Sequence, residues 1–345
     1  MDTLGDCREG GAGNNGGRAL HPALRTGVAP IRVGVRLFSH RSFYMLRVSK
    51  SNAYVKNLNR AIADDKTLFP LAGPLGLSPE TAMAGLESLH SVMVASGSER
   101  VGRKLIHSKP ASHDAEHETP CFGYLYEHVL AHCTDGVVEI EAPQNNPIRV
   151  APVLVVRVSG SPTAQSSYEQ FVDVCDAVAM GLEILAIPFA NDHWTDEDVI
   201  CANGFNFKLA LGEMKGLSRA SRRNFDDIIA HSCFGFSCIE RAGAQLRGFC
   251  AGSRSFSTSL RQLYQACQRY QRDTGEFPIS EGDLVVFQPL CEPMAGSTGE
   301  EWVCSSAGIL LEELRVRFMA KTPTRKVQRK LAACFADDIG QRRTV

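Results

Sequence analysis

The sequence lacks both a long apolar run and a strong net charge. No apolar segment reaches the roughly 18 residues that a transmembrane helix requires, so we expect no membrane partner. The formal net charge of −1 over 345 residues gives no bulk reason to expect binding to nucleic acid or to a lipid surface. With 44% hydrophobic and 22% charged residues, the chain has the composition of a globular protein with one large domain or two ordinary ones.

The cysteines lack the spacing of a zinc site. Twelve cysteines are present, yet no C-x-x-C occurs, and the closest pair, Cys233 and Cys238, has four residues between its members. Zinc ribbons bring their ligands in tighter pairs. We therefore expect free, buried thiols in a reducing compartment.

Acidic residues are absent from residues 10 to 63, a stretch that contains many arginines and several serines. This composition is typical of a mitochondrial targeting peptide. Asp2, Asp6 and Glu9 do not fit that pattern, but Met45 is an alternative start that would remove them. We predict a disordered targeting extension over residues 1–75 and a mitochondrial location, with a cytoplasmic location as the alternative.

A second acid-free stretch covers residues 314 to 335 and is rich in lysine and arginine. We expect residues 321–345 to form a basic C-terminal tail. The simplest interpretation is a solvated face, and the alternative is a strip that binds phosphates, as in RNA.

Between these ends, strand and helix patterns are mixed. Ser78 and Pro79 mark the start of a helix over residues 78–97, because serine caps a helix and proline fits its first turn. Further helices are expected at about 166–182 and 258–273. Strands are expected at 137–141, 148–158, 184–189, 205–211, 236–239 and 284–288. The pattern predicts an α+β fold: a single large domain over residues 76–320, built around a curled mixed β-sheet.

Four segments, in order, resemble the 2-keto-4-pentenoate hydratase family of the fumarylacetoacetate hydrolase superfamily. They read ASGSERVGRKLIHSKP, PCFGYLY, SSYEQFVDVCDAVAMGLEILAIPFANDHWTDEDVICANGFNFKLALG and FPISEGDLVVFQPLCEPMAGSTGEEW. The order and spacing of these segments are more specific than any one of them. The resemblance identifies the chain as a divergent member, and it implies the curled sheet and a homo-oligomer.

The resemblance also implies a divalent metal site, which this sequence has partly lost. Family members bind Mg²⁺ or Mn²⁺ with three carboxylates, two of them in an E-x-E strand, to stabilise the enolate of a 2-oxo acid. Here the third carboxylate is Glu183, whereas Ala151 and Val153 stand in place of the E-x-E pair. A shift of register that brings Glu139 or Glu141 into the site is the alternative. The family's proton-handling lysine corresponds to Lys104, with Arg103 and Ser108 near it in sequence.

A vestigial Glu183 without its two partners would hold Mg²⁺ or Mn²⁺ weakly, because these ions rely on several oxygen ligands. We therefore expect no cofactor and a non-catalytic protein, a pseudoenzyme. Arg103, Lys104 and Ser108 would bind an anionic ligand, either a small carboxylate or RNA phosphates, and the chain could serve as a subunit beside a related chain. The alternative is a divergent Mg²⁺-dependent hydratase, decarboxylase or hydrolase, a lyase of the hydratase type, that uses Lys104 as its catalytic residue.

Five histidines within 26 residues offer one rival site: His107, His113, His117, His128 and His132. The site that this spacing suggests is a zinc ion held with Asp114 or Glu118. However, the segment is loop-like and has no H-E-x-x-H, which favours surface histidines. No G-x-S-x-G is present to support a serine hydrolase.

Overall fold

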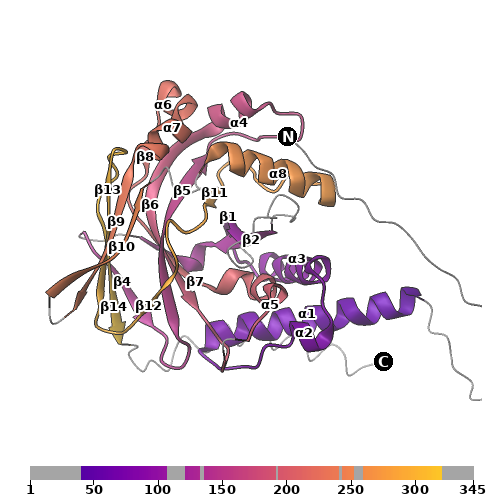
Figure 1. Ribbon diagram of the computed structural model, residues 1–345. Helices are drawn as coiled ribbons and strands as arrows, with labels where there is room; N and C mark the ends of the chain where they lie inside the picture. Colours follow the sequence, from indigo (N-terminus) through magenta and orange to yellow (C-terminus); the bar gives the residue numbers. More distant parts are fainter. Residues whose placement is uncertain are drawn as a thin grey trace, which may run out of the picture. The chain divides into compact units, whose positions relative to one another are not determined.

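The computed structural model divides after Ser39, and the account below concerns the unit from His40 onward (Figure 1). The structure describes residues 40–106, 121–132, 136–191, 193–240, 243–251 and 259–320. Ser108, His107, His113, His117 and the basic tail at 321–345 lie outside these residues, so the predictions made for them stay predictions.

A large curled sheet forms the centre of this unit, in the order β2-β1-β11-β5-β6-β7-β3, with β12 paired to β5 and β8 to β6. Its strands are β1 (Arg100–Ile106), β2 (Cys121–Tyr126), β3 (Leu130–His132), β5 (Ile148–Val158), β6 (Cys175–Ala186), β7 (Asn206–Leu211), β8 (Lys215–Gly216), β11 (Leu284–Val286) and β12 (Met294–Gly296). The middle of the sheet is covered on both faces: β5 is buried at every position from Val150 to Val156. This burial explains its unbroken β-branched sequence.

A second sheet, in the order β10-β9-β13-β14-β4, packs against the first. It consists of β4 (Val138–Ala142), β9 (Cys233–Glu240), β10 (Gly243–Ala251), β13 (Glu301–Ala307) and β14 (Leu314–Ala320). Phe236, Trp302 and Phe318 of this sheet share one apolar core with Val150 and Leu154 of β5. The expected α+β fold around a curled mixed sheet is confirmed.

Helices cover the remaining surfaces. They are α1 (His40–Asp64), α2 (Ala72–Leu75), α3 (Pro79–Ala95), α4 (Tyr168–Val174), α5 (Asp196–Cys201), α6 (Arg219–Arg223), α7 (Phe225–Ala230) and α8 (Leu260–Thr274), with short 3₁₀ turns η2 (Glu127–Val129) and η3 (Asn203–Phe205). The predicted start of α3 is confirmed, because Ser78 caps it and Pro79 is its first residue. In the described part of the chain, no helix is both long and apolar enough to cross a bilayer.

The expected helix over residues 166–182 is wrong beyond Val174. Residues 175–186 form β6, which lies between β5 and β7 and is almost entirely buried. Its alanines, Met180 and Leu182 have high helix propensity, but pairing with strands on both sides outweighs that preference.

The predicted boundary of the N-terminal extension at residue 75 also differs from the structure. Helix α1 packs on α3, and Val55 and Leu58 are fully buried between the helices. The two helices approach closely at Gly85, where an added Cβ would lie 2.6 Å from Ser51 Oγ. Ser51 Oγ also donates a hydrogen bond to the carbonyl of Thr81, at 2.7 Å. Residues from about Ser51 onward therefore belong to the folded unit.

Truncation of Leu58 tests this boundary. We expect Leu58→Ala to lower the free energy of unfolding by about 2–5 kcal/mol, because it removes a fully buried side chain. Asn57→Ala, one residue away on the exposed side of α1, is the control and should change it by less than about 0.5 kcal/mol. Urea denaturation measures both, and equal effects would place α1 outside the cooperative unit.

Candidate functional site

The site is organised by two charged residues from strands that are not neighbours. Lys104 lies on β1 and Glu183 on β6, with β11 and β5 between them. In a flat sheet, three strand spacings would separate the strands by about 14 Å. The Lys104 ammonium nevertheless donates a hydrogen bond to the Glu183 carboxylate. The curl of the sheet therefore creates this contact.

Lys104 and Glu183 are buried, with side chains that are only 4% and 6% exposed. The ammonium also donates to the carbonyl oxygen of Gly204, at 3.0 Å. Removal of either charge would leave the other unpaired in a site with little water, at a cost of several kcal/mol. The three groups therefore form one interdependent set.

Gly204 is the centre of an unusual backbone turn. Asn203, Gly204 and Phe205 all have positive φ, at 53°, 66° and 56°. Left-handed backbone is unfavourable for Asn203 and Phe205, so the surrounding contacts must hold it in place. The Asn203 carboxamide supplies such contacts: it accepts from the Tyr124 N–H and donates to the Tyr124 carbonyl, both at 2.8 Å. The turn is thereby anchored to β2, with the Gly204 carbonyl directed at Lys104.

Ala151 and Val153, which the resemblance aligned with the family's E-x-E carboxylates, lie beside this pair. Ala151 is directly opposite Glu183 in the β5–β6 register, and Val153 is opposite Gly181. Both are fully buried and carry no donor atom. Glu139 and Glu141 lie on β4 in the other sheet and line a different cavity, so the alternative register does not bring them to Glu183.

A cavity of about 270 Å³ opens next to Lys104 and Glu183. Its apolar walls include Trp194, Phe205 and Pro289, and the exposed Arg149 lines it two positions before Ala151. Asp196 also lines the cavity. Across the described residues, no group of three or more histidine, cysteine, aspartate or glutamate side chains is placed to hold a metal ion. Glu183, which already pairs with an ammonium, and Asp196 are fewer than the three carboxylates that the resemblance implies for a Mg²⁺ site.

Arg103 does not share this cavity, because successive side chains of a strand point to opposite faces. Its guanidinium lies 3.9 Å from the centre of the Tyr124 ring, and its Nε donates to the carbonyl of Pro278 at 2.9 Å. Glu87 lies near this guanidinium and accepts a hydrogen bond from Tyr270 Oη, at 3.1 Å. Arg103 and Lys104 are therefore not brought together, in contrast to the expected anion-binding corner.

Sequence reasoning missed Arg149 and the Asn203–Phe205 turn. The signal for Arg149 was its i, i+2 spacing from Ala151, which places both residues on one face of β5. The signal for the turn was the Asn-Gly dipeptide, since both residues tolerate left-handed backbone.

The rival histidine site is not assembled in the part of the structure that is described. His128 stacks on Tyr126, with ring centres 5.6 Å apart, and His132 is exposed at the end of β3. The eight cysteines whose side chains are described are thiols rather than disulfides, and five of them are buried.

The architecture, an α+β domain with a curled central sheet, is a known class of fold. It superposes on 4-oxalocrotonate decarboxylase from Pseudomonas putida, complexed with magnesium and adipate, with a TM-score of 0.66. The sequence identity is 13%, and the match covers 79% of this chain and 98% of the decarboxylase chain. The same enzyme complexed with calcium and acetate gives a TM-score of 0.65 and 12% sequence identity, with the same coverage of both chains. Fumarylpyruvate hydrolase from Pseudomonas aeruginosa, in complex with Mn²⁺ and pyruvate, gives a TM-score of 0.43 and 16% sequence identity. That match covers 65% of this chain and 90% of the hydrolase chain.

No protein-family model matches the sequence, and the curated proteins give no match. The chain therefore has the fold of 4-oxalocrotonate decarboxylase, at low sequence identity. The resemblance inferred from the four sequence segments is confirmed at the level of the fold.

The turn at Gly204 gives a test of the site geometry. A Cβ on Gly204 would lie 2.9 Å from both Cε and Nζ of Lys104, whereas one on Gly275, which also has positive φ, would meet nothing within 4 Å. We expect Gly275→Ala to cost about 1–2 kcal/mol of stability from backbone strain. Gly204→Ala should cost about 1–3 kcal/mol more, because it crowds a lysine that is held at both ends. Equal costs in urea denaturation would mean that Lys104 is free to move.

Proposed function

We propose that this chain is a hydratase-fold protein that binds a small organic carboxylate without a divalent metal and does not perform the metal-dependent chemistry of this fold. One observation carries the proposal: the Lys104 ammonium pairs with Glu183, the one metal-type carboxylate that remains beside Ala151 and Val153. The ammonium compensates the charge of Glu183 in place of a metal cation.

The physical argument concerns ligand number. A Mg²⁺ ion gives up its water reluctantly and is held through carboxylates in near-octahedral geometry. At this position it would meet the methyl groups of Ala151 and Val153, together with a like charge on Lys104. Displacing that ammonium would leave it buried without a partner, which is costly. We therefore derive no step that runs through a metal.

Arg149 supports the carboxylate part of the proposal. Its exposed guanidinium lines the cavity and makes no hydrogen bond or ion pair with another described residue. A guanidinium fork matches a carboxylate with two parallel hydrogen bonds. The apolar walls at Trp194, Phe205 and Pro289 would take the carbon part of the ligand, and about 270 Å³ limits that ligand to a small one.

Oxalate is a suitable probe because it chelates a metal where one is present and pairs with arginine where none is. We expect calorimetry in EDTA to detect oxalate binding to the wild type, and Arg149→Met to weaken it about tenfold or more through loss of charged hydrogen bonds. Arg219→Met, an exposed arginine at the start of α6, is the control and should leave the affinity unchanged.

Mn²⁺ in place of EDTA should not tighten oxalate binding. Tightening of more than about tenfold that disappears in Glu183→Gln would overturn the proposal and favour a metal-dependent enzyme. Hydration of 2-hydroxypentadienoate-type substrates that requires Mg²⁺ and stops with EDTA would overturn it as well.

Three further properties remain predictions: a mitochondrial location, an assembly with a second copy or a related chain, and RNA binding by the basic C-terminal strip. The structure adds one constraint to the mitochondrial prediction: cleavage after Ser51 would remove its hydrogen bond to Thr81, and cleavage after Leu58 would also remove the buried Val55 and Leu58. We expect a reporter fused after residue 44 to enter mitochondria, and the mature N-terminus of the full chain to lie before Ser51. N-terminal sequencing of the purified protein checks this, and a cytosolic reporter would contradict it.

A further inference from the structure

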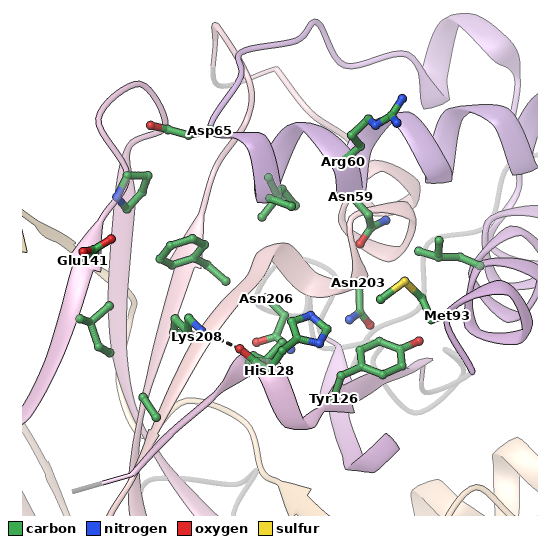
Figure 2. A pocket seen from close by; sticks show the side chains of 18 of the residues that line it. Asn59, Arg60, Asp65, Met93, Tyr126, His128, Glu141, Asn203, Asn206 and Lys208 are labelled. Atoms are coloured by element: carbon green, nitrogen blue, oxygen red, sulfur yellow. Dashed lines mark hydrogen bonds between the residues drawn. The ribbon is translucent and has the colours of Figure 1, made fainter. Parts of the chain in front are cut away.

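A larger cavity, of about 490 Å³, lies between α1, α3, η2, β4 and β7 (Figure 2). Its wall includes Lys208, which pairs with Ile184 in the β6–β7 register, whereas Glu183 pairs with Leu209. Paired residues share one face of a sheet and adjacent residues lie on opposite faces. Lys208 and Glu183 therefore point to opposite sides, and the two cavities are separate.

A β-bulge gives this cavity its polar groups. The β6–β7 register shifts between Ile184 and Leu185, so that Asn206 pairs with Leu185 and Lys208 with Ile184. Asn206, Phe207 and Lys208 all line the cavity, although a regular strand would direct the middle residue away. Bulges redirect side chains in this way near functional sites.

Asn206 is the unexplained group in this wall. Its Nδ2 and Oδ1 are both buried, and neither has a hydrogen-bond partner among the described residues. An amide left unpaired in this way costs about 1–3 kcal/mol for each group. Asn206 is one of the residues that line the cavity, and Figure 2 labels it there. Such a cost is offset if a bound molecule supplies both an acceptor and a donor.

Lys208 is close to Asn206 in the same wall. Its ammonium donates to the carbonyl of His128 at 2.6 Å and forms no ion pair within the described parts of the chain. Burial lowers the pKa of Lys208. An ammonium with unused donors and no ion-pair partner among the described residues can bind an anion.

Several other polar residues of the wall are already engaged. Asp65 accepts from the backbone N–H groups of residues 144, 145 and 146, at 2.6 to 3.0 Å. Asn59 donates to the carbonyls of Val55 and Cys201, at 2.9 and 2.7 Å. Glu139 lies 3.4 Å from Arg317. Much of the remaining wall is apolar, with Leu89, Met93 and Tyr126 among its residues.

We propose that this second cavity binds a small apolar carboxylic acid that carries a hydroxyl or amino group on the carbon next to the carboxylate. Lys208 and the Nδ2 of Asn206 donate to the carboxylate, and the Oδ1 of Asn206 accepts from the neighbouring hydroxyl or amino group. The hydrocarbon part packs on Leu89, Met93 and Tyr126. The proposal does not depend on the carboxylate site at Arg149.

Three probes of similar size separate the elements of this recognition: leucine, 2-hydroxy-4-methylpentanoate and 4-methylpentanoate. We expect calorimetry to show that at least one of the first two binds about tenfold more tightly than 4-methylpentanoate, which leaves Asn206 Oδ1 unpaired. The tighter of the two identifies the donor as a hydroxyl or an amino group. Equal affinity for all three probes, or no binding, would overturn the proposal.

Substitutions assign the binding to this cavity. We expect Lys208→Met and Asn206→Leu each to weaken the best probe about tenfold or more. Lys215→Met is a matched control, because Lys215 also donates to one backbone carbonyl, that of Leu310 at 2.7 Å, but lies outside the cavity. Arg149→Met should leave this affinity unchanged. Loss of binding in Arg149→Met but not in Lys208→Met would place the ligand in the other pocket and overturn the assignment.

A stability measurement guards against unfolding of the variants. Because the Asn206 amide is buried without a partner, Asn206→Leu should keep or raise the melting temperature of the free protein. A large fall would assign Asn206 a structural role and contradict the inference.

Discussion

The buried contact between the Lys104 ammonium and the Glu183 carboxylate is the constraint on which the site depends. It joins β1 to β6 across two intervening strands, so it can exist only while the sheet is curled. Each charge needs the other, because both are nearly inaccessible to water. This mutual dependence gives a physical reason for a buried Glu183 beside the apolar Ala151 and Val153. Once a lysine compensates the glutamate, apolar neighbours cost less to bury than unpaired carboxylates would.

The Asn203–Phe205 turn shows how the protein sustains an unfavourable backbone at this point. Three successive residues with positive φ carry strain that Asn203 offsets through two hydrogen bonds to Tyr124. Phe205 offsets more of it by packing edge-on against Phe189 and Trp194, with ring centres 5.7 and 5.8 Å away. The result is a carbonyl group fixed on the Lys104 ammonium and an aromatic ring fixed in the cavity wall.

Sequence patterns were informative where one local rule decides the structure. Ser78 and Pro79 specify the start of α3, and the β-branched run in β5 reflects burial on both faces. Sequence patterns failed where strand pairing in the folded protein outweighs local preference. In β6, for example, the alanines and leucines have the composition of a helix. The segment around Ser51 to Ile62 reads as a basic extension, because its buried face has only a few apolar residues spaced between polar ones.

The candidate site was predictable in its parts but not in its assembly. The position of Ala151 opposite Glu183 follows from the resemblance together with strand alternation. The pairing of Lys104 with Glu183 does not, because the two residues are 79 positions apart and their meeting depends on the curl of the whole sheet. Assignment of β1 as a strand would have separated Arg103 from Lys104, since neighbours on a strand face opposite ways.

One short segment, residues 203–208, contributes to both cavities. Its left-handed turn directs the Gly204 carbonyl to Lys104, and the bulge that follows brings Asn206 and Lys208 into the wall of the large cavity. The turn and the bulge are consecutive, so neither can relax without moving the other. A change that releases the strain at Asn203 would therefore shift polar groups in both cavities at once. The geometry of the large cavity is thus tied to the same buried ion pair that organises the small one.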